Sequence, residues 1–76
     1  MALQLPIMFE VQSWPEGIEK STIAPYVKVE AMDELDAARR LLRIPLQRDE
    51  RADIYVRALV RKLGPNGVTT RIYAAE

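Results

Sequence analysis

Apolar and polar residues alternate along the start of the sequence, and this pattern restricts the fold more than any other feature. Every second position from 3 to 11 is apolar, namely Leu3, Leu5, Ile7, Phe9 and Val11. Successive side chains of a strand point to opposite faces, so a period of two predicts a strand with one buried face. The chain must therefore build a sheet and cover one side of it.

Two further segments repeat the alternation, from Thr22 to Glu30 and from Val68 to Ala75. We expect the first two strands to pair as an antiparallel hairpin, because only the turn-forming residues 13–17 and a long acidic loop separate them. Pro6 lacks the N–H group that a ladder hydrogen bond needs. The first part of the first strand is therefore expected at a sheet edge.

A helix is predicted from about Asp33 to Arg43. The apolar residues of this region recur at helical spacing, as Ala31, Leu35, Ala38 and Leu42. Asp33 is a suitable N-cap, and Asp36 can accept hydrogen bonds from free amides or complement the helix dipole. Pro45 is expected to end the helix because a proline restricts the residue before it.

The segment Asp49–Leu63 fits two interpretations. As a helix, it has one apolar stripe made of Ala52, Tyr55, Val56, Leu59, Val60 and Leu63. As a strand, it has one apolar face made of Ile54, Val56, Ala58 and Val60, with a turn at residues 64–67 that leads into the last strand. We favour the helix, because most of its residues are good helix formers.

These elements define an α+β fold, in which a small antiparallel sheet has one or two helices packed on one face. The order is β-β-α-α-β, or β-β-α-β-β if Asp49–Leu63 is extended. With 76 residues, the chain is expected to form a single domain over residues 1–76.

The sequence contains no cysteine and no histidine. These absences remove disulfides, thiolate metal ligands, the usual general base and the common nucleophile pairs. Two acidic clusters, residues 33–36 and 49–53, are interpreted as a helix cap and as solvated surface charges. We therefore expect a protein that is not an enzyme and that has no cofactor and no metal site.

Charge is sorted along the chain although the net charge is zero. Residues 1–36 sum to −5 and residues 37–76 sum to +5, and all eight arginines lie in the second part. Such asymmetry predicts either a basic binding surface or internal pairing of two oppositely charged layers. The sequence leaves both alternatives open.

Arginine suits acidic partners because its planar guanidinium forms forked hydrogen bonds with carboxylates and phosphates. Arg57 and Arg61 would share a face on a helix, and so would Arg40 and Arg43. Trp14 is either an interface anchor or a cover for the edge of the core. The candidate partner-binding residues are Arg39, Arg40, Arg43, Arg57, Arg61, Trp14 and Tyr73.

Our leading hypothesis is a non-catalytic interaction module that binds and occludes a macromolecular partner, either an acidic protein surface or a nucleoprotein complex. Small modules of this kind are common among phage and mobile-element accessory proteins, including inhibitors of host defence nucleases. A second hypothesis is nucleic-acid binding by the arginine-rich C-terminal half. A third is a self-assembling structural protein, as a homodimer or larger, in which oppositely charged halves meet.

The longest apolar run, Leu5 to Phe9, is far shorter than the roughly 20 residues that cross a bilayer. The first residues lack a basic segment followed by an apolar stretch and a cleavage site. We therefore expect a cytoplasmic protein with no membrane partner.

Overall fold

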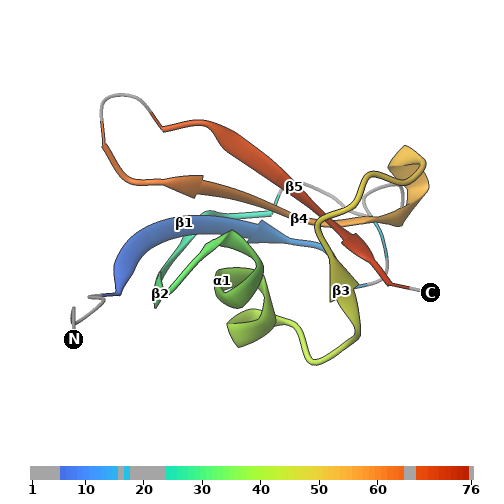
Figure 1. The fold of residues 1–76 in the computed structure, drawn as a ribbon, viewed down its shortest axis with the longest axis horizontal. Coiled ribbons are helices and arrows are strands. Elements are labelled where there is room, and N and C mark those ends of the chain that lie inside the picture. The colour runs from blue at the N-terminus through green and yellow to red at the C-terminus, as the bar shows by residue number, and fades with distance from the viewer. Residues whose placement is uncertain (1–5, 16, 18–23, 65–66, 76) are drawn as a thin grey trace.

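One antiparallel sheet and one α-helix are the main elements of the fold (Figure 1). The structure is a computed structural model, and it describes residues 6–15, 17, 24–64 and 67–75. In chain order the elements are β1 (Ile7–Ser13), β2 (Val27–Ala31), α1 (Glu34–Leu41), β3 (Leu46–Gln47), the 3₁₀ turn η2 (Asp53–Tyr55), β4 (Val56–Lys62) and β5 (Thr69–Ala74). The strands are arranged in the sheet as β2-β1-β4-β5-β3. This confirms the α+β fold in the order β-β-α-β-β, with the short β3 added.

The favoured helix over Asp49–Leu63 is wrong, since this segment holds η2 followed by strand β4. Val56, Ala58 and Val60 are buried at alternate positions, as the extended interpretation requires. β4 is the central strand and pairs with β1 on one side and β5 on the other. Ladder bonds along both edges and burial of one face outweigh the modest helix propensity of these residues.

The predicted hairpin of the first two strands is confirmed, because β1 pairs antiparallel with β2 from Ile7 opposite Ala31 to Val11 opposite Val27. The edge position was expected only for the part of this strand around Pro6; within β1, Ile7 and Met8 pair with β2, and the register with β4 begins at Phe9. β1 lies between β2 and β4, and Pro6 precedes the strand, so it breaks no ladder bond. The predicted residues 3–5 and 22–23 lie outside the described part of the chain.

Helix α1 confirms the predicted helix but is shorter. Asp33 is its N-cap, as expected, and the helix ends at Leu41. Leu42 already has an extended backbone, with φ −115° and ψ 126°, although its N–H still donates to the carbonyl of Ala38. Arg43 therefore lies beyond the helix and does not share a helical face with Arg40.

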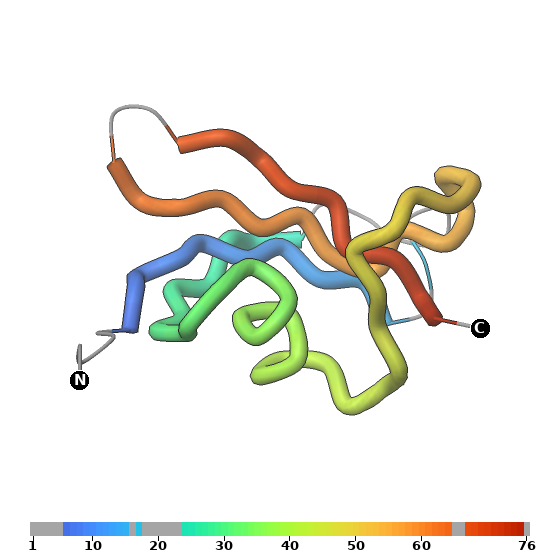
Figure 2. Tube along the Cα trace, viewed as in Figure 1, coloured from blue at the N-terminus to red at the C-terminus, as the bar shows by residue number. Residues whose placement is uncertain are grey.

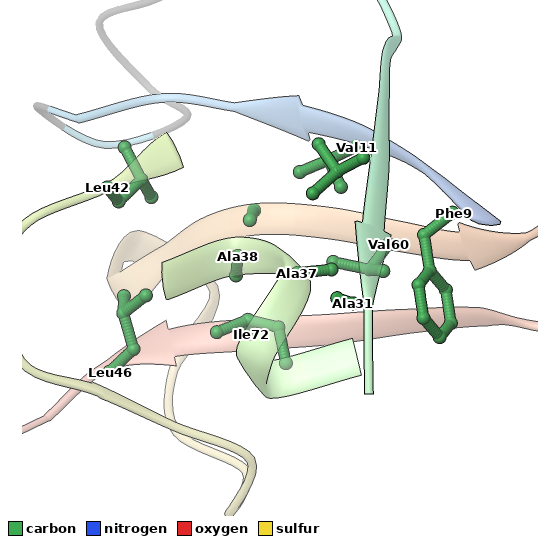
Figure 3. Packing of buried hydrophobic residues seen from close by; sticks show 11 residues of the cluster. Phe9, Val11, Ala31, Ala37, Ala38, Leu42, Leu46, Val60 and Ile72 are labelled. Atoms are coloured by element: carbon green, nitrogen blue, oxygen red, sulfur yellow. The ribbon is translucent and has the colours of Figure 1, made fainter. Parts of the chain in front are cut away.

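The core lies between α1 and one face of the sheet (Figure 3). Ala31, Ala37, Ala38 and Ala58 are fully buried, and their small side chains let the helix backbone approach the strands closely. Larger side chains fill the space around them. These are Phe9, Val11, Val29, Leu42, Leu46, Val60 and Ile72, all in the same buried cluster.

The chain that leaves α1 runs past the end of β5 before it enters β4 (Figure 2). There β3 pairs with β5, with Leu46 opposite Ala74, and the N–H of Ala75 donates to the carbonyl of Pro45 at 2.9 Å. We call the sheet surface turned away from α1 the open face. It carries the side chains that alternate with the buried ones, including Glu10, Lys28, Glu30, Leu59, Arg61 and Arg71.

Candidate interaction surface at the end of the helix

Two aspartates organise the start of α1. The Oδ1 atom of Asp33 accepts from the backbone N–H of Asp36 at 2.8 Å. In return, Oδ2 of Asp36 accepts from the N–H of Met32 at 2.9 Å, just before the helix. This reciprocal arrangement is a variant of the capping box, and it satisfies donors that the helix itself leaves unpaired.

Asp36 also pairs with Arg40 one turn later, with Oδ2 3.4 Å from NH2 of the guanidinium. The hydrogen bond from Met32 is the largest influence on the Asp36 carboxyl and lowers its pKa. Partial burial opposes this effect, while the charges of Arg40 and Arg39 add to it. One predicted contact residue, Arg40, is thus partly used to hold the helix together.

Arg39 and Arg43 differ from Arg40 because neither forms an ion pair with a carboxylate among the described residues. Both are exposed, and no carboxylate in the described part of the chain lies within ion-pair distance of either. Their guanidinium groups are therefore available to an external anion. They lie at the end of α1 and just after it, on the layer that covers the sheet (Figure 1).

Two apolar side chains accompany these arginines. Leu41 is 36% exposed and Ile44 is 37% exposed. We call residues 39–44 the α1 end segment; its exposed residues are Arg39, Arg40, Leu41, Arg43 and Ile44, with Leu42 buried between them. Sequence reasoning missed Leu41 and Ile44. Neither residue belongs to the predicted apolar stripe of the helix. Their exposure could therefore have been predicted from the sequence.

Arg57 and Arg61 lie on β4, where both are engaged within the molecule. Nε of Arg61 donates to Oε1 of Glu10 at 3.0 Å, and its guanidinium stacks 4.1 Å from the centre of the Tyr26 ring. NH1 of Arg57 donates to the carbonyls of Ile54 and Val56. The structure therefore places these two predicted contact residues away from the α1 end segment, as part of the sheet.

The remaining arginines also have partners. Arg48 lies 3.8 Å from Glu34 and Arg71 lies 3.2 Å from Asp53. The guanidinium of Arg51 stacks over Tyr55 and donates to a backbone carbonyl of β5. Exposed pairs of this kind contribute only about 0 to 1 kcal/mol. Ion pairs between the acidic first half and the arginine-rich second half are nevertheless present, at Arg40–Asp36, Arg48–Glu34 and Arg61–Glu10, so part of the positive charge is paired internally.

The two predicted aromatic contact residues are not at the surface. Trp14 is 8% exposed and Tyr73 is 4% exposed. The N–H of Trp14 donates to the carbonyl of Arg57 at 2.8 Å and so prolongs the ladder between β1 and β4. Both rings thus cover the protein's own interior, and neither is included in the candidate surface.

Pockets and metal sites are the other features to consider in the described part of the chain. One open depression is lined by Glu34, Thr70 and the ends of the β4–β5 hairpin, and another lies over Leu59 and Arg71 on the open face. No cluster of three or more acidic side chains among residues 6–15, 17, 24–64 and 67–75 has the geometry of a metal site. No helix within those ranges is long and apolar enough to cross a membrane.

The fold and the α1 end segment define a small α+β protein with an arginine-bearing helical layer. Comparisons with protein-family models, with curated proteins and with solved structures gave no match.

Proposed function

We propose that this domain is a non-catalytic interaction module that uses the α1 end segment to bind and occlude an acidic surface of a protein partner. One observation carries the proposal: Arg39 and Arg43 are exposed and form no ion pair with any described carboxylate, and they lie next to the exposed Leu41 and Ile44. Arginine beside aliphatic side chains is typical of protein interfaces, where the guanidinium forms charged hydrogen bonds and the apolar groups exclude water.

The backbone on either side of these residues is held in place. Leu42 and Leu46 are each only 5% exposed and belong to the core. The hydrogen bond from Ala75 to the carbonyl of Pro45 ties the end of the segment to the sheet. Because binding then orders little additional chain, less of the interaction free energy is lost to conformational entropy.

Nucleic-acid binding has weaker support. A protein that binds a phosphate backbone gathers basic groups along one surface. Here the arginines are divided between the helical layer and the sheet, and several pair with carboxylates. The acidic residues at the start of α1, Asp33, Glu34 and Asp36, would also repel a polyanion. We therefore propose a protein as the partner.

The absence of histidine and cysteine supports a role in binding rather than catalysis. The biological setting that we propose is an accessory or inhibitor protein of a phage or mobile element. This part of the proposal depends on the small size of the chain and its lack of histidine and cysteine.

Affinity capture from a lysate of the cells in which the protein acts tests the proposal. The immobilised wild type is compared with the double variant Arg39→Glu/Arg43→Glu, while Arg40 is kept because it pairs with Asp36. The control is Lys62→Glu/Arg71→Glu, which changes the charge equally at exposed positions of the hairpin and in addition breaks the exposed Arg71–Asp53 pair. Each capture is run at about 0.05 and 0.5 M salt, because screening weakens exposed charge contacts.

We expect the wild type and the control to retain an acidic protein at low salt. The Arg39/Arg43 variant should retain at least roughly tenfold less, since opposed charges at an interface repel. Equal loss in both double variants would show an unspecific dependence on net charge and would contradict the assigned surface. Retention of nuclease-sensitive material alone would favour the nucleic-acid hypothesis instead.

A further inference from the structure

Strand β2 forms one edge of the sheet, and the register shows which of its backbone groups point outward. The backbone N–H of Leu63 donates to the carbonyl of Met8, and the backbone N–H of Trp14 donates to the carbonyl of Arg57. The backbone groups of the even-numbered residues of β1 therefore point toward β4. The odd-numbered residues of β1 therefore bond toward β2, to partners that are also odd-numbered. Lys28 and Glu30 are left with N–H and C=O groups directed away from the sheet.

Within the described part of the chain, the side chains of the same two residues have no ion-pair partner. Lys28 and Glu30 are exposed on the open face, and neither forms an ion pair with any residue in the described ranges. The carboxylate of Glu10, opposite Lys28 in the β1–β2 ladder, bonds with Arg61 instead. The edge thus presents one unpaired cation and one unpaired anion, spaced two residues apart.

We propose that β2 pairs antiparallel with β2 of a second copy of this chain, with the two-fold axis at Val29. Lys28 then lies directly opposite Glu30 of the partner subunit, and Glu30 lies opposite Lys28 of the partner subunit. Because these residues have outward-pointing backbone groups, both are hydrogen-bonded pairs of the new ladder. Two opposite-charge pairs form on the open face, and such cross-strand pairs stabilise a sheet.

The neighbouring registers are less favourable. With the axis at Lys28, the two lysines oppose each other, and with the axis at Glu30, the two glutamates do. An axis between two residues would pair an outward-pointing backbone group with an inward-pointing one, and no regular ladder results. The charge pattern of β2 therefore selects one register of self-pairing.

Exposed apolar residues at the ends of β2 fit the same register. Val27 is 42% exposed, and it lies opposite Ala31 of the partner subunit. Tyr26 is 40% exposed and Met32 is 37% exposed, and the register also places these two opposite each other across the axis. Pairing would cover part of each side chain, and contact between a thioether and an aromatic ring is favourable.

A two-fold axis perpendicular to the sheet places both copies of α1 on the same side and leaves the open faces continuous. β2 is a short strand of five residues (Figure 1), so the two copies would meet over few residues. We therefore expect a weak dimer, with a dissociation constant on the order of 100 µM. This surface is separate from the α1 end segment, so its failure leaves the proposed partner binding untouched.

Sedimentation equilibrium between about 10 µM and 1 mM tests the dimer. The single variants Lys28→Glu and Glu30→Lys place like charges opposite each other and should weaken the dimer about tenfold or more. The double variant Lys28→Glu/Glu30→Lys exchanges the charges and should restore the wild-type constant. A monomer throughout the range, or single variants that dimerise like the wild type, would overturn the proposal.

Zero-length carbodiimide cross-linking of the wild type gives an independent readout that needs no variant. In a mixture of ¹⁴N- and ¹⁵N-labelled protein, a mixed-isotope peptide that joins Lys28 to Glu30 is expected, because only contact between subunits produces it. Cross-linked dimers that never contain this peptide would overturn the register even if sedimentation shows a dimer.

Discussion

Glu10 and Arg61 lie directly opposite each other on β1 and β4, and their side chains meet at 3.0 Å between Oε1 and Nε. The pair joins the acidic first half of the chain to its arginine-rich second half, across 51 residues of sequence. Some of the acidic and basic residues of the two halves therefore pair with each other within the sheet. Among the described residues, Arg39 and Arg43 at the end of α1 are two neighbouring arginines that remain outside such pairs.

The coupling between Glu10 and Arg61 is expected to be small but measurable. Both side chains are partly exposed, at 20% and 42%, so solvent screens their attraction. A double-mutant cycle with Glu10→Gln and Arg61→Gln, measured by urea unfolding, should give an interaction free energy of about 0.2–1 kcal/mol. A value of zero would contradict the expected stabilisation by this pair.

Asp36 should make stability depend on pH in the acid range. The pKa of its carboxyl is lowered in the folded state, first by the N–H of Met32. A lowered pKa stabilises the fold above the unfolded value, about 3.9, and this contribution is lost as pH falls through the lower folded pKa. Asp36→Asn should therefore unfold at a lower temperature at neutral pH and show a shallower decline in acid.

Carbon-detected NMR titration of the Asp36 carboxyl provides the direct check. An Asp36 midpoint at or above the ordinary aspartate value would contradict the capping interaction.

Ile72 should contribute to stability through burial alone, since its side chain is fully buried in the core. Ile72→Val removes one methylene group and should lower the free energy of unfolding by about 0.5–1.5 kcal/mol. Val68 is 77% exposed and near the end of the same hairpin. Val68→Ala should change stability by no more than about 0.5 kcal/mol, and a larger loss there than at Ile72 would contradict the described core.

Gly67 should not tolerate a side chain. A Cβ atom added there would clash with the backbone carbonyl oxygen of Lys62, so the backbone would have to move. Gly67→Ala should cost about 1–3 kcal/mol in thermal or urea unfolding. The control is Lys62→Ala, which truncates an exposed side chain and should have an effect within about 0.5 kcal/mol. Equal stability of both variants would contradict this turn geometry.

The sequence was sufficient to predict elements whose signals are local. The alternation around Phe9 and Val11 predicted β1, and Asp33 with the apolar spacing after it predicted α1. The helix was predicted to continue to Arg43, but it ends at Leu41. Leu42 packs into the core with an extended backbone, so the helix has already ended before Pro45 is reached. Boundaries of this kind depend on packing, which local propensity does not contain.

The strand β4 could not be distinguished from a helix by its own residues. Val56 and Val60 belong both to the apolar stripe of a helix and to the apolar face of a strand. The segment is a strand because it pairs with β1 on one side and with β5 on the other. The same limit applies to the arginines. Whether Arg61 is available or paired depends on its register with Glu10, which is set by the whole sheet.

The candidate surface was therefore predicted only in part. Arg39, Arg40 and Arg43 were identified from residue type and charge, and they lie together in the α1 end segment. Arg57 and Arg61 lie on β4, while Trp14 and Tyr73 are buried. Residue type indicates what a side chain can bind, but exposure and neighbours decide whether it is available.

Amide hydrogen exchange of the captured complex, compared with the isolated protein, tests the central claim most directly. If the α1 end segment is the binding surface, protection should increase at residues 39–44 and remain unchanged along β4 and β5. Protection confined to the sheet, or no difference between the complex and the isolated protein, would contradict the account.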